Sequence, residues 1–359
     1  MAQILEKDIM RALSRVVDPD LHRDIVSLGM VENLQIVGND VSMTLVLTTP
    51  ACPIKEQMKA ACEEAIGSIA GVDAILVEVT SRVPQNRIGA NKVAIPGVRN
   101  TIAVGSGKGG VGKSTVSVNL ALALAQDGAR VGLLDADIHG PNVPLMLGIT
   151  DKPKPANGKI MPVERYGLKV MSMGFFVADG DPIIWRGPML AKMLQQFLYD
   201  VEWGEIDYLV LDLPPGTGDV QLTLAQSMPL TGALIVSTPQ DVALMDAMKA
   251  LNMFLKLDVP ILGIVENMSY FVAPDGQKIE IFGHGGARAA AERTEVPFLG
   301  EVPLDMAIRI GGDSGQPITL QEDGPQSATF HHISRGLAAQ VSILALGLQQ
   351  PVEPNPVSA

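Results

Sequence analysis

The chain has 359 residues, of which 47% are hydrophobic and only 4% are aromatic. That length suits two domains, and their cores must consist mainly of aliphatic side chains. The formal net charge of −12 at pH 7, without any run of lysines and arginines, disfavours nucleic acid as a partner.

Cysteine content and the N-terminal sequence indicate the compartment. The two cysteines, Cys52 and Cys62, cannot form a disulfide framework, and they fit a reducing environment. The N-terminal stretch MAQILEKDIMRALSRVVDPD is charged throughout and lacks the apolar core of a signal peptide. The longest uncharged segments are too polar to span a membrane. We therefore expect a cytoplasmic protein without a membrane partner.

The first 81 residues predict a small α+β domain. Apolar residues recur at helical spacing near the N-terminus and again after Pro53, and the turn sequence Gly38-Asn39-Asp40 separates two strand-like runs. In chain order, the expected elements are a helix over 3–17, two strands within 32–49, a helix over 53–70 and a strand over 72–81.

Residues 82–98 contain proline and glycine without a clear period and are interpreted as a linker. In the domain expected over 99–348, continuous apolar runs alternate with helical patterns, which predicts a doubly wound, mostly parallel α/β sheet. The expected strands are 101–106, 130–137, 208–214, 232–239 and 261–268, and the expected helices are 114–127, 188–199, 218–227, 241–256 and 284–294. The proline-rich tail, 349–359, is expected to be disordered.

A glycine-rich loop joins the first strand of this domain to its first helix. In AVGSGKGGVGKSTVSVNL, Gly107, Gly112, Lys113 and Ser114 fit the pattern G-x-x-x-x-G-K-[ST] of a P-loop. Backbone N–H groups and the helix N-terminus would face phosphate oxygens. Lys113 would add a charge at the β- and γ-phosphates, and the Ser114 hydroxyl would bind Mg²⁺. The loop therefore predicts ATP binding.

Three aspartates follow buried strands of the expected sheet. Asp135 and Asp137 end the strand in VGLLDADIHGPN, and Asp212 ends the strand in YLVLDLPPGTGD. Because strand C-termini face the phosphates in this fold, we expect Asp212 to help hold Mg²⁺ and Asp137 to orient the attacking water. The alternative, open above all for Asp135, is that these aspartates cap the following helices.

A second lysine, Lys108, precedes the P-loop lysine by five positions. The stretch GKGGVGKST resembles the deviant Walker A loop of the MinD/Mrp class of P-loop ATPases. The resemblance implies that Lys108 reaches across a homodimer interface to the nucleotide of the other subunit, as an arginine finger does. The alternative is a solvated lysine on a flexible loop. The residues expected to act in catalysis are Lys108, Lys113 and Asp137.

Motifs along nearly the whole chain resemble the Mrp/ApbC family of iron–sulfur cluster carriers. They include DADIHGPNVPLMLG, DYLVLDLPPGTGD, VSTPQDVALMDA and GIVENMSYF, with VVDPDL and TTPACPIKEQM in the N-terminal domain. The resemblance places Asn267 near the adenine. The alternative is that Asn267 only satisfies the turn at the end of its strand. In WRGPML, Trp185 and Arg186 would line the dimer interface, or Trp185 would be core. The residues expected to contact ATP are Gly105, Ser106, Gly107, Lys108, Gly109, Gly110, Val111, Gly112, Lys113, Ser114, Thr115 and Asn267.

The chain departs from this family at the cluster motif. Members that hold a bridging 4Fe–4S cluster carry Cys-Pro-x-Cys after NMSYF, and the two cysteine positions here are Ala273 and Gly276. Neither residue can ligate iron, whereas such a cluster is normally held by four thiolates. Cluster binding is therefore implied by the resemblance and not by these positions.

The remaining candidate ligands lie elsewhere. Cys62 is on the apolar face of its helix and is expected to be core. Cys52 lies in a strand-to-helix turn, where a helix N-terminus favours the thiolate, so it is either a cluster ligand or a small residue of the turn. Asp275 and His284 are non-thiol candidates, or ordinary loop and helix-start residues.

Together these features predict a slow ATPase that uses ATP and Mg²⁺, and the resemblance implies that it is a homodimer that carries an iron–sulfur cluster. The resemblance implies cluster donors and apoproteins as partners. One alternative is a MinD- or ParA-like positioning ATPase, although GLAAQVSILALGLQQ lacks a basic amphipathic face for a membrane. Another alternative is a nucleotide-gated scaffold without a cluster of its own.

Overall fold

The computed structural model describes residues 4–86, 92–138, 140–176, 187–321 and 324–348. The chain divides into two compact units. Among the described residues, the first unit consists of 4–84 and 342–348, and the second runs from Gln85 to Val341. The tail expected to be disordered, 349–359, and the pair Trp185 and Arg186 lie outside the described residues.

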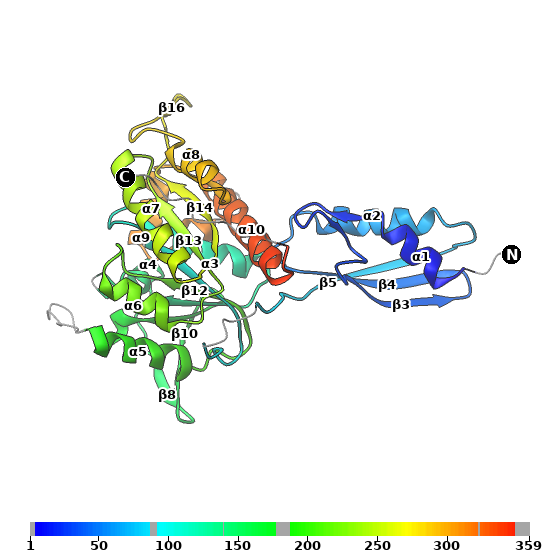
Figure 1. Ribbon diagram of the computed structural model, residues 1–359, viewed down its shortest axis with the longest axis horizontal. Helices are drawn as coiled ribbons and strands as arrows, with labels where there is room; N and C mark the ends of the chain where they lie inside the picture. Colours follow the sequence, from blue (N-terminus) through cyan, green and yellow to red (C-terminus); the bar gives the residue numbers. More distant parts are fainter. Residues whose placement is uncertain (1–3, 87–91, 139, 177–186, 322–323, 349–359) are drawn as a thin grey trace. The chain divides into compact units, whose positions relative to one another are not determined.

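The N-terminal unit is a three-stranded sheet with two helices (Figure 1). Strands β3 (Val31–Val37) and β4 (Asp40–Leu47) are antiparallel, and β5 (Ile75–Ser81) pairs parallel with β4. Helix α2 (Lys55–Gly67) packs on β5 and β4, and α1 (Glu6–Leu13) packs on α2. Side chains buried in this core include Ile9, Leu45, Cys62 and Ile66.

The expected helix over 3–17 is wrong at its C-terminal end, because α1 ends at Leu13. Two short paired strands follow it, β1 (Val17–Asp18) and β2 (Arg23–Asp24). Since Pro19 follows Asp18, helical backbone is disfavoured at Asp18. The Asp18 carboxylate instead accepts the backbone N–H groups of Asp20 and Leu21 at 2.9 and 3.0 Å, which closes a turn.

The second unit is built on one eight-stranded sheet in the order β10-β11-β7-β12-β6-β13-β14-β17. Its strands are β6 (Val98–Gly105), β7 (Val131–Asp135), β10 (Val163–Arg165), β11 (Leu168–Ser172), β12 (Ile206–Asp212), β13 (Gly232–Ser237), β14 (Ile261–Asn267) and β17 (Phe298–Val302). All neighbours are parallel except β10 and β11. The predicted doubly wound, mostly parallel α/β fold with a small α+β unit before it is confirmed.

Helices and hairpins complete this unit. They are α3 (Lys113–Gln126), α4 (Val143–Met146), α5 (Gly187–Tyr199), α6 (Asp219–Ser227), α7 (Asp241–Lys256), α8 (Gly286–Arg293), α9 (Met306–Asp313), α10 (Pro325–Ala345), the 3-10 turns η1 (Met173–Phe176) and η2 (Ile318–Leu320), and the hairpin strands β8 (Lys154–Ala156), β9 (Lys159–Met161), β15 (Phe271–Val272) and β16 (Lys278–Ile279). Helix α3 packs on β7 and β12, and α7 packs on β13 and β14.

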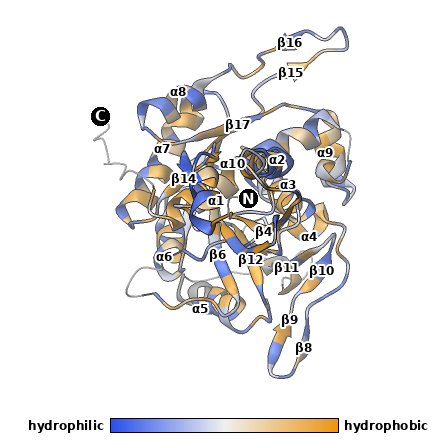
Figure 2. Cartoon of the chain, turned by 90° about the vertical axis from the view of Figure 1, so that its right-hand side faces the viewer, coloured by the Kyte–Doolittle hydropathy of each residue, from blue (hydrophilic) through white to orange (hydrophobic). Residues whose placement is uncertain are grey.

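Burial explains why the central strands could be found from sequence. Every residue of β12, β13 and β14 is buried, as continuous apolar runs predict for parallel strands covered on both faces. In Figure 2, β12 is coloured mostly as hydrophobic, whereas α8 carries many hydrophilic residues. Among the helices of the described residues, none has both the length and the hydrophobicity of a membrane span.

Helix α8 starts two residues later than the expected helix over 284–294. Gly285 has φ of 76°, which is left-handed backbone outside the helix. The fully buried Glu266 carboxylate accepts the N–H groups of Gly285 and Ala287 at 2.9 and 2.7 Å. It therefore satisfies N–H groups at the start of α8 that lack an intrahelical partner.

Part of the segment interpreted as a linker is held firmly within the second unit. The Asn86 side chain is buried and donates to the side-chain oxygen of Asn100 at 2.8 Å and to the carbonyl of Val341 at 3.3 Å. Buried amides need such partners. The linker boundaries of 82–98 stay a prediction, although Asn86 itself is fixed to β6 and α10.

Candidate nucleotide-binding site

The glycine-rich loop follows the C-terminal end of β6, beside the C-terminal ends of β7 and β12. Asp135 and Asp212 are register partners at the last positions of β7 and β12. The first residue of α3 is Lys113, directly after the loop. The sheet therefore brings the loop and the aspartates of two strands to one place, as the sequence predicts.

Two loop glycines are required by their surroundings. Gly112 has φ of 81°, and a Cβ atom there would collide with the side-chain nitrogen of Asn267. A Cβ atom on Gly107 would collide with the backbone of Asp246 in α7. The loop thus keeps its backbone close to its neighbours and exposed to a ligand.

The loop opens on a cavity of about 240 Å³. The residues lining it are Ser106, Lys108, Gly109, Gly110, Val111, Gly112, Lys113, Ser114, Thr115, Asp137, Gly140, Asn142, Met146 and Pro215. Most of the residues expected to contact ATP are in this set, whereas Gly105, Gly107 and Asn267 are not. The assignment of all of them to ATP stays a prediction.

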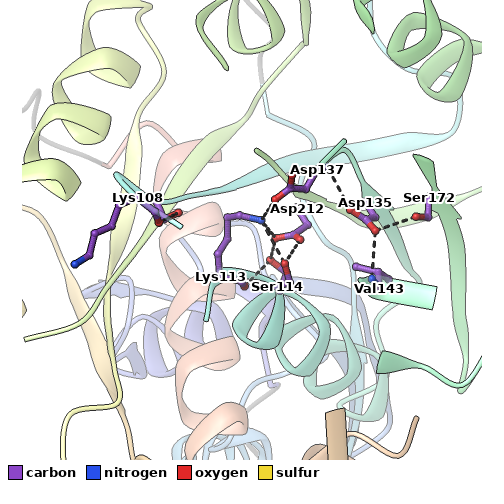
Figure 3. A network of polar contacts seen from close by, with 10 residues as sticks. Lys108, Lys113, Ser114, Asp135, Asp137, Val143, Ser172 and Asp212 are labelled. Atoms are coloured by element: carbon purple, nitrogen blue, oxygen red, sulfur yellow. Dashed lines mark hydrogen bonds and ion pairs between the residues drawn. The ribbon is translucent and has the colours of Figure 1, made fainter. Parts of the chain in front are cut away.

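The Lys113 ammonium group and the Asp212 carboxylate form a buried ion pair of 2.8 Å, shown in Figure 3. Asp212 also accepts the hydroxyl of Ser114 at 2.6 Å and the hydroxyl of Ser117 at 2.7 Å. Asp212 is fully buried and Lys113 is only 5% exposed. Both carboxylate oxygens are therefore satisfied, and the two side chains expected to meet phosphate and Mg²⁺ are held in place.

Asp137 lines the same cavity from the end of β7. Its carboxylate lies 3.6 Å from the Lys113 ammonium group, and the residue is 8% exposed. A carboxylate at the cavity wall beside the P-loop lysine is placed to orient water at a terminal phosphate. Its predicted catalytic role stays a prediction.

Asp135 does not line the cavity. Its Oδ2 accepts the Ser172 hydroxyl at 2.8 Å and the Val143 N–H at 3.2 Å, and its Oδ1 accepts the Asp137 N–H at 3.2 Å. Complete burial, followed by the nearby charge of Asp212, raises the pKa of Asp135 to about 8. Since Val143 is the first residue of α4, the structure gives Asp135 the capping contact that the sequence left open.

Lys108 and Asn267 are placed differently from Lys113. In Figure 3 the Lys108 side chain points away from the network around Asp212. Its backbone carbonyl accepts the Ser106 hydroxyl at 3.0 Å. The buried Asn267 amide donates to the Val111 carbonyl at 2.8 Å, so it braces the loop from behind. A reach across a dimer by Lys108 and an adenine contact by Asn267 stay predictions.

The donor set fits the phosphates of a nucleotide and a divalent cation. The glycine backbone and Lys113 offer positive groups to phosphate oxygens. The Ser114 hydroxyl and the Asp212 carboxylate offer two oxygen atoms 2.6 Å apart, and oxygen is the ligand that Mg²⁺ prefers.

The positions of the family's cluster cysteines lie in the β15–β16 hairpin. The N–H of Ala273 donates to the Gln277 carbonyl at 2.9 Å, and Gly276, with φ of 84°, closes the turn. Asp275 accepts the Gln277 N–H at 3.0 Å. The His284 Nε2 atom forms a hydrogen bond with a carboxylate oxygen of Glu301 at 3.0 Å. Both non-thiol candidates therefore have other partners.

The two cysteines differ in their surroundings. Burial raises the pKa of the Cys62 thiol to about 11, and Cys62 lies in the core of the N-terminal unit, as expected. Cys52 is partly exposed in the turn before α2. Within the part of the chain that the structure describes, no three His, Cys, Asp or Glu residues are grouped to hold a metal ion.

Sequence reasoning missed two contributors to this network. Ser117 follows Lys113 by one helical turn on α3, and that spacing could have indicated a contact with Asp212. Ser172 ends β11, a strand that the sequence did not predict, so no local signal could have placed it beside Asp135. Asn142, Met146 and Pro215 also line the cavity without having been predicted.

Fold and site together define a P-loop nucleotide-binding protein. Residues 97–338 match the family of NUBPL iron-transfer P-loop NTPases, and residues 6–79 match the iron-sulfur cluster assembly protein family. The chain belongs to the first of these families and carries the second as its N-terminal unit, which confirms the resemblance inferred from the motifs.

Curated relatives agree over most of the chain. It is 48% identical over 348 residues to the iron-sulfur cluster carrier protein of Synechocystis, which covers 94% of this chain and 98% of that protein. The carrier protein of Escherichia coli K12 is 41% identical over 343 residues, covering 94% and 93%. The iron-sulfur cluster transfer protein NUBPL of Dictyostelium discoideum is 52% identical over 258 residues, covering 70% and 80%.

Solved structures support the same fold. A nucleotide-binding protein from Archaeoglobus fulgidus, in complex with ADP, superposes with a TM-score of 0.57 and 40% identity, covering 65% of this chain and 91% of that one. The cell division ATPase MinD of Pyrococcus furiosus has a TM-score of 0.51 and 25% identity, covering 66% and 97%.

Proposed function

We propose that this protein is an ATP-hydrolysing homodimer that carries an iron–sulfur cluster and delivers it to apoproteins. The observation that carries the ATPase part is the meeting of Lys113, Ser114 and Asp137 at one cavity, with Asp212 behind them. The cargo is inferred from the family and from relatives named as cluster carriers.

In this account each residue has a defined task. Lys113 binds the β- and γ-phosphates, while Asp212 holds its side chain. Ser114 and Asp212 would hold Mg²⁺, which would supply positive charge to the phosphates. Asp137 accepts a hydrogen bond from a water molecule whose oxygen bonds to the γ-phosphorus as the bond from that phosphorus to the β–γ bridging oxygen breaks. The water proton passes through Asp137 to the released phosphate, and ADP leaves with the bridging oxygen.

Dimerisation rests on Lys108. Its side chain lines the mouth of the cavity but points away from Asp212, so it is free of the contacts that hold Lys113. A positive charge supplied to the nucleotide of a second copy would couple hydrolysis to dimer formation.

Cluster carriage needs a ligand set other than the hairpin. Ala273 and Gly276 carry no thiol, so Cys52 of each subunit, completed by a partner protein or a small thiol, is the ligand source that we propose. The absence of cysteine at positions 273 and 276 also favours a second candidate function, a nucleotide-gated scaffold that assists cluster transfer without holding a cluster.

Two measurements test the proposal. Phosphate release with Mg²⁺ should be lost in Lys113→Ala, and equal rates in both proteins would refute the ATPase. Anaerobic reconstitution with iron and sulfide should give a charge-transfer absorption that Cys52→Ala lowers. No such absorption in the wild type, alone or with an apoprotein acceptor, would favour the scaffold.

A further inference from the structure

Three polar residues form a row across neighbouring strands of the large sheet. Ser172 on β11 and Asp212 on β12 are both register partners of Asp135 on β7. The Asp212 side chain binds Lys113 of the P-loop, whereas the Asp135 side chain is bonded to Ser172 on the opposite side of the row. The middle carboxylate is completely buried and does not line the cavity.

The contacts of Asp135 are concentrated on the connection that follows its own strand. One oxygen accepts the N–H of Asp137, and the other accepts the N–H of Val143, at 3.2 Å in both cases. The Ser172 hydroxyl fixes the second oxygen at 2.8 Å, as Figure 3 shows. One side chain thus fastens this connection at two points, one near β7 and one at the start of α4.

Residues at or next to these two anchor points line the cavity. Asp137 lines the cavity 3.6 Å from the Lys113 ammonium group. Asn142, which precedes Val143, and Met146 line the same cavity. A shift at either anchor would therefore move the cavity wall that lies opposite the P-loop.

We propose that Asp135 is a positioning residue, which holds the backbone at Asp137 and Val143 so that the Asp137 carboxylate is aligned for ATP hydrolysis. It acts without touching the nucleotide or Mg²⁺. This role rests on the proposed ATPase function.

The chemistry of the side chain explains why a carboxyl group is needed there. Each carboxyl oxygen has lone pairs and accepts a donor, whether or not the group carries a proton. An asparagine has one oxygen and one NH₂ group, and its nitrogen accepts no hydrogen bond. Asp135→Asn therefore releases one anchor while it nearly keeps the side-chain volume. Ser172→Ala removes one hydrogen bond to Asp135 but leaves both carboxyl oxygens to accept the N–H groups of Asp137 and Val143. It also removes the acceptor of the Gly174 N–H.

A double-mutant cycle on the full chain tests the role through turnover. Asp135→Asn should lower kcat about tenfold and change KM for ATP by less than about threefold, because alignment and not binding is lost. In the Asp137→Asn background, the same change should lower kcat by less than about twofold. Equal losses in both backgrounds, or a rise in KM with unchanged kcat, would overturn the proposal.

Asp207→Asn is the matched control for losing a buried carboxylate. Asp207 lies at the other end of β12, where its carboxylate binds Arg130 at 2.8 Å, far in register from Asp212. This variant should lower the melting temperature without lowering kcat of the folded protein. If it lowered kcat as much as Asp135→Asn does, general destabilisation would account for both.

Hydrogen exchange with bound Mg²⁺ and ADP tests the anchor without any turnover. Asp135→Asn, which releases one anchor, should speed exchange at the amide of Asp137 or of Val143, and Ser172→Ala should do so more weakly, while peptides of the P-loop exchange as in the wild type. Unchanged exchange at both amides would refute the anchor even if ATP is hydrolysed. A wild type that does not hydrolyse ATP would refute the proposed function, and faster exchange in the variants would still establish the anchor.

Discussion

The Lys113 ammonium group lies 2.8 Å from a carboxylate oxygen of Asp212, and both side chains are buried beneath the glycine-rich loop. The pair joins the first residue of α3 to the last residue of β12. Because the Asp212 carboxylate also accepts hydrogen bonds from two hydroxyl groups of α3, it holds the helix and the loop to the sheet.

The first prediction concerns the stability of this pair. Lys113→Met leaves Asp212 buried without its counter-charge and should lower the free energy of unfolding by about 3 kcal/mol. The double variant Lys113→Met, Asp212→Asn should recover most of that loss, since position 212 then carries no charge. Urea unfolding of the nucleotide-free protein measures both. Lys108→Met is the control and should change the value by at most about 0.5 kcal/mol; equal losses in the two methionine variants would contradict the pair's importance.

The second prediction concerns assembly. Sedimentation with Mg²⁺ and a slowly hydrolysed ATP analogue should show dimers for the wild type and monomers for Lys108→Ala, because the charge offered to the second nucleotide is lost. ADP affinity should stay within about threefold, since Lys113 still binds the phosphates of its own site. Lys249→Ala removes a lysine of α7 that is paired with Asp246 and should dimerise normally. A dimer that persists in Lys108→Ala would exclude this role.

The third prediction concerns pH. The hydrogen bond to Glu301 raises the pKa of His284 above its usual value, against the opposing effect of burial. Because the folded pKa is the higher one, the stabilisation from this contact is complete below about pH 6.5 and is lost as pH rises through the folded pKa. In an NMR titration, Glu301→Gln should lower the His284 pKa. The Glu280 carboxylate is farther from the imidazole, at 3.6 Å, so Glu280→Gln should lower the His284 pKa less. A larger decrease in Glu280→Gln than in Glu301→Gln would contradict Glu301 as the main cause of the raised pKa.

The fourth prediction concerns thiol chemistry. The thiol of Cys62 has a pKa of about 11, so at pH 9 only about 1% of it is thiolate, and it is also shielded by the core. Iodoacetamide should therefore modify the partly exposed Cys52 at least about tenfold faster than Cys62 in the folded protein. Mass spectrometry of the two peptides measures the rates, and the same labelling in urea should bring them together. Similar rates in the folded protein would contradict the burial of Cys62.

The sequence predicted the parts of the fold that follow from strong local patterns. Continuous apolar runs revealed β12, β13 and β14, because these strands are buried on both faces. Strands β11 and β17 were not predicted, because they have five residues each and contain polar residues such as Lys169 and Glu301. Strand β11 pairs with β7 and β17 pairs with β14, both far away along the chain, and no local window contains that information. The β10–β11 hairpin across Tyr166 and Gly167 is, in contrast, a local pairing that the sequence analysis missed.

The same division applies to the site. The P-loop could be recognised because glycine, lysine and serine stand at fixed spacing, and the structure places them around one cavity. The contact of Asp135 with Ser172 could not be predicted, since Ser172 is 37 residues away on a strand that reaches Asp135 only by pairing with β7. The contact of Asp135 with the start of α4 was the capping alternative that the sequence left open. Cys52 was singled out by its place before a helix, but local sequence could not reveal what a partner protein would add.

ATP hydrolysis by Asp137→Asn, compared with the wild type, tests the central claim most directly. The variant keeps the P-loop and the pair of Lys113 and Asp212, so ADP should bind within about threefold of the wild-type affinity. Its rate of phosphate release with Mg²⁺ should fall at least about tenfold, because the carboxylate that orients water has become an amide. A variant that releases phosphate as fast as the wild type would contradict the account.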